Sequence, residues 1–297
     1  MNIVGRCVAL VVLSILFTIS LSASAADTGT RVAYRAPAEA VTHFRLADTN
    51  ELVLGAPPRE DADEAKAIYG PVAEYLSTVL GRKVVFHHAG NWGVYQGLMQ
   101  KGAYDLEFDG PHFNSWRIER TQHNVLVKAS GDFVFGVLVL KDNDRIKELK
   151  QLAGRTICAS APPNLGTLTV LNEFSNPARQ PIIVNTDGWK EIHQGLLAGR
   201  CVAAVLPLKQ LEKFEKNGGR QSRLIFRGAA LPDNALSAGP RLTPAEQDKI
   251  ARAMLSPEGE QATARLREKY AQGKPFVAAS NKEFVGLSTY LKNEWGY

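Results

Sequence analysis

The sequence has few long hydrophobic runs. The one that stands out, Cys7 to Leu21, is too short to span a bilayer comfortably. Arg6 precedes this run and Ala23-Ser24-Ala25 follows it, which is the order of an export signal with its cleavage site. No later run is long enough to cross a membrane. We therefore expect a signal peptide over residues 1–25, cleaved near Ala25, a loose arm over 26–47, and a mature protein in the periplasm.

The chain also lacks a strong charge of one sign. Its formal net charge is +5, and the lysines and arginines are scattered rather than clustered among aromatic side chains. A nucleic-acid-binding protein would carry a basic patch of that kind, so we exclude this class. The small positive excess is compatible with an anionic ligand.

Cysteine is scarce, with 3 residues in 297. Cys7 falls in the signal, which leaves Cys158 and Cys201, each in a short apolar stretch typical of a buried strand. In an oxidising compartment such a pair forms a disulfide, and the alternative is two buried thiols. A disulfide across a loop of this length would stabilise the fold by about 3–4 kcal/mol.

The residue patterns of catalysis are missing as well. The histidines lack the spacing of metal ligands, and no His-Cys or His-Ser pair has a third orienting group. We therefore predict that the protein is not an enzyme and holds no metal and no cofactor.

What the chain does contain is an alternation of short apolar strands with amphipathic helices, which is typical of open, mostly parallel α/β sheets. A helix is expected at Tyr69–Leu80, with Pro71 in its first turn. Three helices close the chain, and capping boxes at Thr243–Glu246 and Ser280–Glu283 open the first and the last of them. The expected strands are 51–55, 83–87, 104–108, 133–140, 156–159, 181–184, 201–206 and 224–226.

The pattern restarts after the strand at 133–140, so we predict two lobes around a cleft. Residues 48–140 and 237–297 would form the first lobe and residues 141–236 the second, with crossovers near Val139–Lys141 and Pro232–Gly239. Ligands of open α/β sheets bind beyond the carboxyl ends of the strands. The loops expected at the cleft are 56–60, 89–92, 109–112, 160–167 and 186–189.

The most informative of these loops is the turn Asn164-Leu165-Gly166-Thr167. It follows the strand at 156–159 and the pair Pro162-Pro163, and it opens a predicted helix. Backbone N–H groups at such a turn are unpaired and lie at the positive end of the helix dipole, which suits an anion. An ordinary capped loop between a strand and a helix is the alternative.

From about Asp48 to the C-terminus the chain resembles the phosphate, phosphite and phosphonate solute-binding proteins of ABC transporters. Residues 92–110, W-G-V-Y-Q-G-L-M-Q-K-G-A-Y-D-L-E-F-D-G, followed by Pro111, match an aromatic residue, a short helix, Gly, Asp, an apolar strand and a Gly-Pro turn. The stretch G-L-L-A-G-R-C-V-A-A-V at 195–205 is similar to the family pattern in the second half. The resemblance implies the type II periplasmic-binding fold.

The resemblance also implies a function. The protein would capture phosphate, phosphite or a phosphonate-like oxyanion between its lobes, act as a monomer, and deliver the ligand to an ABC permease in the inner membrane. The family commonly supplies Ser and Thr hydroxyls where this chain has Asn164, Leu165 and Gly166, so only Asn164 and the adjacent Thr167 offer polar side chains. The frame of the pocket carries over, while its lining is altered.

Four further residues are expected at the ligand. Trp92 and Trp189 would wall the pocket and stack on an organic part of the ligand, or else pack at lobe edges. Asp109 would accept a hydrogen bond from a protonated oxyanion or pair with an ammonium group, or else cap its own turn. His112 would donate to the anion, or else be a partly exposed histidine with no role in binding. Arg59 could steer or clamp an anion from the first loop, but it is interpreted as a solvated loop charge, and Glu107 is interpreted as structural.

Two alternatives use the same fold. The tryptophans and Asp109 also suit a cationic or heteroaromatic ligand. The protein could instead be a sensor subunit that presents its closed form to a membrane receptor.

Overall fold

The computed structural model describes residues 50–216 and 219–295, all of which belong to one compact unit. The expected signal peptide and arm, and therefore Cys7, lie outside the described residues. Within the described ranges, no helix is both long enough and apolar enough to cross a membrane.

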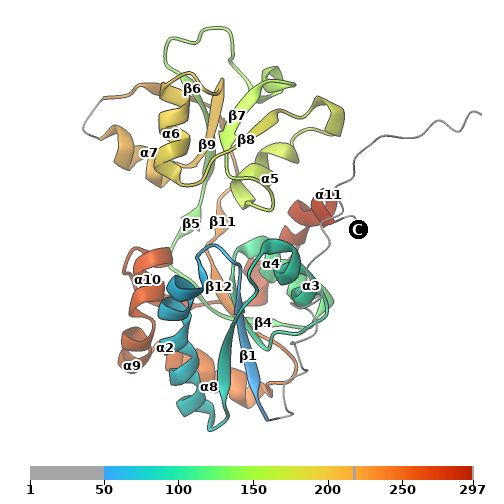
Figure 1. The fold of residues 1–297 in the computed structure, drawn as a ribbon, viewed down its shortest axis with the longest axis vertical. Coiled ribbons are helices and arrows are strands. Elements are labelled where there is room, and N and C mark those ends of the chain that lie inside the picture. Colours follow the sequence, from blue (N-terminus) through green and yellow to red (C-terminus); the bar gives the residue numbers. More distant parts are fainter. Residues whose placement is uncertain (1–49, 217–218, 296–297) are drawn as a thin grey trace, which may run out of the picture. The chain divides into compact units, whose positions relative to one another are not determined.

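The first lobe is built on a six-stranded sheet of order β13-β4-β12-β3-β1-β2 (Figure 1). Strand β1 is parallel to β2 and β3, whereas β12 is antiparallel to β3 and β4 and β13 is antiparallel to β4. The strands are β1 (Leu52–Ala56), β2 (Val84–His88), β3 (Leu106–Asp109), β4 (Asn124–Ala129), β12 (Ala235–Ala238) and β13 (Phe276–Ala278).

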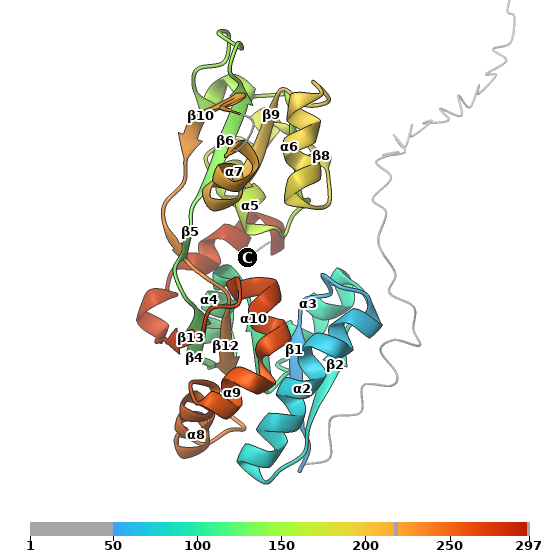
Figure 2. The same ribbon diagram turned by 90° about the vertical axis from the view of Figure 1, so that its left-hand side faces the viewer.

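Helices cover this sheet and bury its apolar side chains. Leu52 and Leu54 of β1 and Leu106 of β3 are fully buried in one cluster with side chains of α2, α8 and α10. Figure 2 shows α2 and α8–α10 beside the first sheet. The helices are α2 (Ala62–Leu80), α3 (Trp92–Gln100), α4 (Pro111–Arg120), α8 (Pro244–Met254), α9 (Pro257–Ala262) and α10 (Ala264–Ala271).

Helix α2 begins earlier than the sequence pattern predicts. Asp61 caps it by accepting from the Glu64 N–H at 2.8 Å, and Pro71 lies inside the helix rather than in its first turn. Ile68 and Tyr69, which precede the proline, are buried. Their packing against the sheet therefore holds the helix together through a residue that usually interrupts one.

The second lobe is built on a five-stranded sheet of order β10-β6-β9-β7-β8. Strand β7 is parallel to β8 and β9, and β6 is antiparallel to β9 and β10. The strands are β6 (Phe135–Leu140), β7 (Thr156–Ala159), β8 (Ile182–Asn185), β9 (Ala203–Pro207) and β10 (Ser222–Arg227). The helices are α5 (Leu165–Leu171), α6 (Trp189–Leu197), α7 (Leu208–Glu215) and the 3₁₀ turns η1 (Leu149–Leu152) and η2 (Pro177–Arg179).

Two short strands, β5 (Asp132–Phe133) and β11 (Leu231–Pro232), pair antiparallel and run between the two sheets (Figure 1). The crossovers therefore lie near residues 132 and 231, and the expected crossover near 139–141 lies instead within β6 and just after it. Residues 135–140, which we expected to end the first lobe, pair with β9 and β10 of the second.

Both sheets are mixed rather than mostly parallel, and the crossovers explain why. Strand β12 follows β11 directly and β6 follows β5 directly, each without a helix between. A strand that enters without a crossover helix is not constrained to run parallel to its neighbours. Each of these two strands sits between two antiparallel partners.

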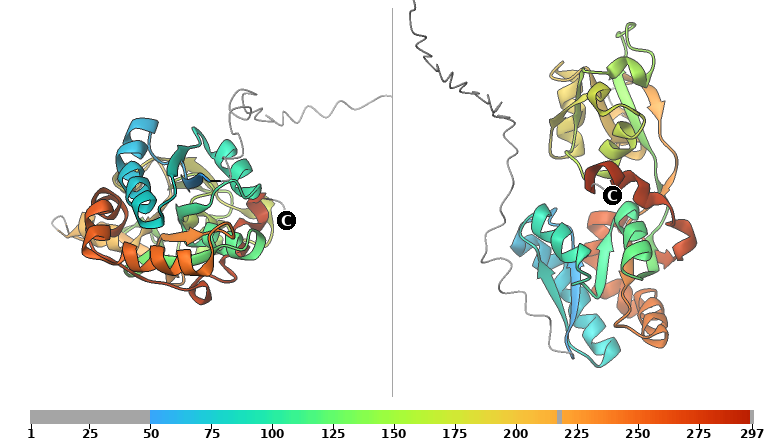
Figure 3. Two further views of the ribbon diagram at one scale, coloured as in Figure 1. Left: turned by 90° about the horizontal axis from the view of Figure 1, so that it is seen from below. Right: turned by 90° about the vertical axis from the view of Figure 1, so that its right-hand side faces the viewer.

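The C-terminal segment touches both lobes. It comprises η3 (Asn281–Glu283), η4 (Leu287–Leu291) and α11 (Lys292–Trp295), so the last expected helix is a 3₁₀ turn behind the predicted capping box at Ser280. Leu291 is fully buried with Phe113 and Trp116 of α4 and with Leu168 of α5. The right panel of Figure 3 shows this segment in dark red.

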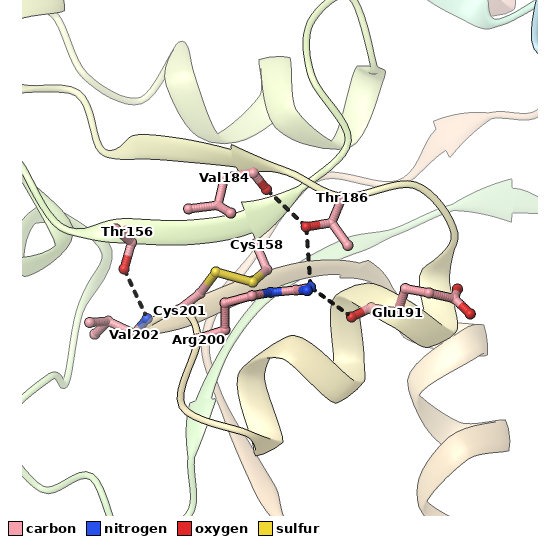
Figure 4. Close-up of a disulfide and its surroundings, with 8 residues drawn as sticks. All are labelled: Thr156, Cys158, Val184, Thr186, Glu191, Arg200, Cys201 and Val202. Atoms are coloured by element: carbon pink, nitrogen blue, oxygen red, sulfur yellow. Dashed lines mark hydrogen bonds between the residues drawn. A yellow bond between two sulfur atoms is a disulfide. The ribbon is translucent and has the colours of Figure 1, made fainter.

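Cys158 of β7 and Cys201, before β9, are joined by a disulfide (Figure 4). Next to it, Arg200 Nη2 donates to Thr186 Oγ1 at 3.4 Å and to the Glu191 carbonyl at 3.3 Å. The Thr186 N–H donates to the Ala159 carbonyl at 3.0 Å. These contacts fix the loop after β8 against the end of β7.

Candidate functional site

A cavity of about 1150 Å³ is lined by residues of both lobes. All five loops expected at the cleft contribute to it: Arg59 follows β1, Trp92 follows β2, His112 follows β3, Asn164 follows β7 and Trp189 follows β8. The crossover segment 132–135 closes another side. The cavity thus lies at the carboxyl ends of the parallel strands, where open α/β sheets bind ligands.

One wall of the cavity is an aromatic cluster of the first lobe. Asn91 caps α3 by accepting from the Val94 N–H at 3.0 Å, which places Trp92 at the first helical position, 36% exposed. The Trp92 ring stacks on Phe113, with centroids 6.2 Å apart, and Phe113 contacts the His112 ring at 4.0 Å. All three of these side chains line the cavity.

A second aromatic wall belongs to the second lobe and to the crossover. The Phe133 and Phe135 rings stack with centroids 5.6 Å apart, and Trp189, half-buried at the start of α6, lies 6.3 Å from Phe135. Gly166 of α5 lies under Phe135, because a Cβ at that position would come within 2.5 Å of the phenyl ring. The glycine therefore lets α5 approach the wall closely.

His112 has one ring nitrogen committed and one without a partner. Its Nε2 lies 3.0 Å from the Pro163 carbonyl, and because a carbonyl only accepts, Nε2 carries the hydrogen. Its Nδ1 is then an acceptor, buried and with no hydrogen-bond partner among the described residues. Burial lowers the pKa of His112 to about 4, so the ring is neutral near pH 7. His112 thus bonds to the loop of the opposite lobe rather than standing as a cation in the site.

Asp109 is fully buried and does not line the cavity. Its carboxylate pairs with Arg59 at 3.0 Å and Arg117 at 3.3 Å, and it accepts hydrogen bonds from the Tyr95 hydroxyl and from the Gly110 N–H. Its oxygens are therefore occupied by the protein. Arg59, which we interpreted as a solvated charge, lines the cavity and lies over the Tyr270 ring, 5.6 Å from its centroid.

Only the first half of the turn at 164–167 reaches the cavity. Asn164 and Leu165 line the cavity, whereas Gly166 and Thr167 do not and are buried. The Gly166 N–H donates to Asn164 Oδ1 at 3.0 Å, and Thr167 Oγ1 donates to the Ser160 carbonyl. Two of the four residues thus reach the cavity, and the other two hold the turn in shape.

Charged side chains of both signs also line the cavity, and the sequence analysis missed nearly all of them. The cations are Arg59, Lys209, Arg227 and Lys269, and the anions are Glu60, Asp132, Asp187, Glu212 and Asp233. Burial raises the pKa of Asp233 to about 6. Lys209 lies on α7 and Lys269 on α10. Sequence periodicity predicts only that these positions are polar, so it could not assign them to the cavity. In the described part of the chain, no group of three or more His, Cys, Asp or Glu side chains could hold a metal ion.

Two α/β lobes, joined by two adjacent crossovers and sharing a cavity at their strand ends, define a substrate-binding protein of the periplasmic type. The family described as ABC transporter, phosphonate, periplasmic substrate-binding protein matches residues 54–284, and this chain belongs to that family. The expected fold and family are confirmed. The family also implies an extracytoplasmic location and a role in transport.

Individual relatives match this chain either over a short segment or at low sequence identity. The phosphate-import protein PhnD of Mycolicibacterium smegmatis is 32% identical over 122 residues, and this match covers 37% of each chain. XAC2383 from Xanthomonas citri, bound to ATP, has a TM-score of 0.66 at 14% identity, covering 83% of this chain and 98% of that one. PhnD1 from Prochlorococcus marinus, in complex with methylphosphonate, has a TM-score of 0.57 at 16% identity, covering 84% and 100%. At these identities the two structures show the fold alone.

Proposed function

We propose that this protein captures a phosphorus oxyanion, such as phosphate, phosphite or a phosphonate, in the interlobe cavity and presents it to an ABC permease as a monomer. The observation that carries the proposal is the position of the cavity at the strand ends of both lobes, with cationic side chains from each lobe on its surface. Membership of the phosphonate substrate-binding family supports the ligand class.

The chemistry of the lining suggests how the anion is held. Arg59 is oriented by the buried Asp109 carboxylate, so it presents a fixed guanidinium to the cavity. Across the cavity, the Asn164 amide nitrogen and the Leu165 N–H are donors at the start of α5, while Gly166 and Thr167 act by holding the turn. Trp92, His112 and Trp189 would surround the rest of the ligand. Only the closed state contacts the ligand from both lobes, so binding favours closure.

Calorimetry on ligand-stripped protein tests the proposal. Titration with phosphate, phosphite and methylphosphonate should release binding heat for at least one of them, while acetate should give none. Arg59→Gln should weaken that binding by about tenfold or more, because a charge-assisted hydrogen bond contributes roughly 1.5–3 kcal/mol.

A matched control is Arg252→Gln, on α8 and outside the cavity lining. It should leave the affinity unchanged. Absence of heat with every phosphorus oxyanion would reject the ligand class and leave the fold intact.

A further inference from the structure

We propose that the physiological ligand is an organophosphorus acid whose phosphorus carries a flat aromatic or heteroaromatic group, rather than an inorganic anion or a short alkylphosphonate. The inference rests on the proposed function and concerns the part of the cavity that an oxyanion leaves empty.

The first argument is the size of the cavity. Drug-sized ligands occupy pockets of roughly 300–1,000 Å³, and this cavity is about 1150 Å³. A single tetrahedral anion would fill a small part of that space. Closure of the lobes reduces the volume, but it brings the same lining side chains closer together, so the chemical character of the remainder is kept.

The second argument is the character of that remainder. Trp92 is 36% exposed on the first-lobe wall, and Phe133 and Trp189 are partly exposed on the other side, whereas Phe113 and Phe135 are buried and pack against Trp92 and Phe133. Aromatic faces turned toward an open cavity are hydrated at a free-energy cost that a stacked planar group removes. Because Trp92 and Trp189 come from different lobes, closure would place a ring between them. A small oxyanion gains nothing from either wall.

Calorimetry with three phosphonates of graded character tests the inference. Phenylphosphonate and cyclohexylphosphonate have rings of similar size, but only the first is flat and aromatic, and methylphosphonate has no ring. Phenylphosphonate should bind at least about fivefold more tightly than the other two, because aromatic pairing contributes roughly 0.5–1.5 kcal/mol per ring beyond buried area. Trp189→Leu should lower the phenyl-to-cyclohexyl affinity ratio, and Trp92→Leu/Trp189→Leu should bring it close to one.

Phe214→Leu is the matched control. Phe214 lies on α7, stacks on His193 at 5.5 Å and does not line the cavity, so this variant should keep the wild-type ratio. Methylphosphonate or phosphate binding as tightly as phenylphosphonate would overturn the inference while the proposed function stands. Binding of none of these compounds would reject both.

Discussion

At the residue scale, the sequence identifies the aromatic members of the cavity better than its charged members. Trp92 and Trp189 line the cavity because each directly follows a strand-end loop, and loop position can be predicted from local pattern. Asp109 could not be placed this way. Its two arginine partners lie 50 positions before it and 8 positions after it, and only the tertiary fold brings them together.

Buried histidines at this scale make stability depend on pH. Burial lowers the pKa of His112 to about 4 and that of His123 to about 3, below the value of about 6.5 expected in the unfolded chain. Between these values the unfolded chain binds protons on these two histidines that the folded chain does not, so their contribution to stability should fall as the pH drops from 6.5 toward 4. Asp233 and Glu107 oppose this, because burial raises their pKa values to about 6 and about 7, and the stability that each contributes at low pH is lost as the pH rises through those values.

Urea unfolding at pH 7, 6 and 5 measures this dependence. Each histidine contributes a slope of up to about 1.4 kcal/mol per pH unit. His123→Gln removes that histidine's contribution. Between pH 6 and 5 the unfolding free energy of the variant, relative to that of the wild type, should therefore rise by up to about 1.4 kcal/mol, whatever the variant's stability at pH 7. An unchanged slope would show that His123 is protonated alike in both states.

At the element scale, what sequence periodicity predicts well is the alternation of strands and helices. It fails where tertiary packing outweighs a local signal. Pro71 suggested the start of a helix and lies within one instead, and β12, Ala235-Leu236-Ser237-Ala238, has too weak a pattern to be recognised as a strand. All four of its residues are buried between β3 and β4, so its environment rather than its composition makes it a strand.

The disulfide is a covalent constraint on the second lobe. Its cysteines are 43 positions apart, so the double variant Cys158→Ala/Cys201→Ala should lose about 3–4 kcal/mol of unfolding free energy. Urea unfolding of the variant and of the wild type measures the loss. Wild-type protein held in a strong reductant should match the variant, which separates the covalent link from side-chain packing. Equal stability of all three samples would contradict a structural role for the bond.

At the scale of the whole molecule, the C-terminal segment contacts both lobes, although the sequence pattern predicts that it belongs to the first lobe alone. Leu291 is fully buried, and its side chain packs in one cluster with side chains of α4 in the first lobe and α5 in the second. The Asn172 amide of the second lobe also donates to the Tyr290 carbonyl at 3.4 Å. Such contacts between distant segments leave no periodic trace, so sequence patterns could not predict them.

This connection should carry measurable stability. Leu291→Ala should lower the unfolding free energy by about 2–4 kcal/mol, because it removes a buried side chain and leaves a cavity. Val285→Ala is a suitable control, since Val285 is 60% exposed and its truncation should stay within about 0.5 kcal/mol. Chemical denaturation of both variants gives the comparison, and equal losses would mean that the segment does not hold the lobes.

The pairing of β5 with β11 restricts how the protein can move. Two strands that lie side by side and share hydrogen bonds bend together, so, apart from the contacts of the C-terminal segment, the crossovers favour rotation of the lobes about a single axis. Twisting and sliding would break that ladder. One distance between labels on opposite rims should therefore be enough to follow the extent of closure.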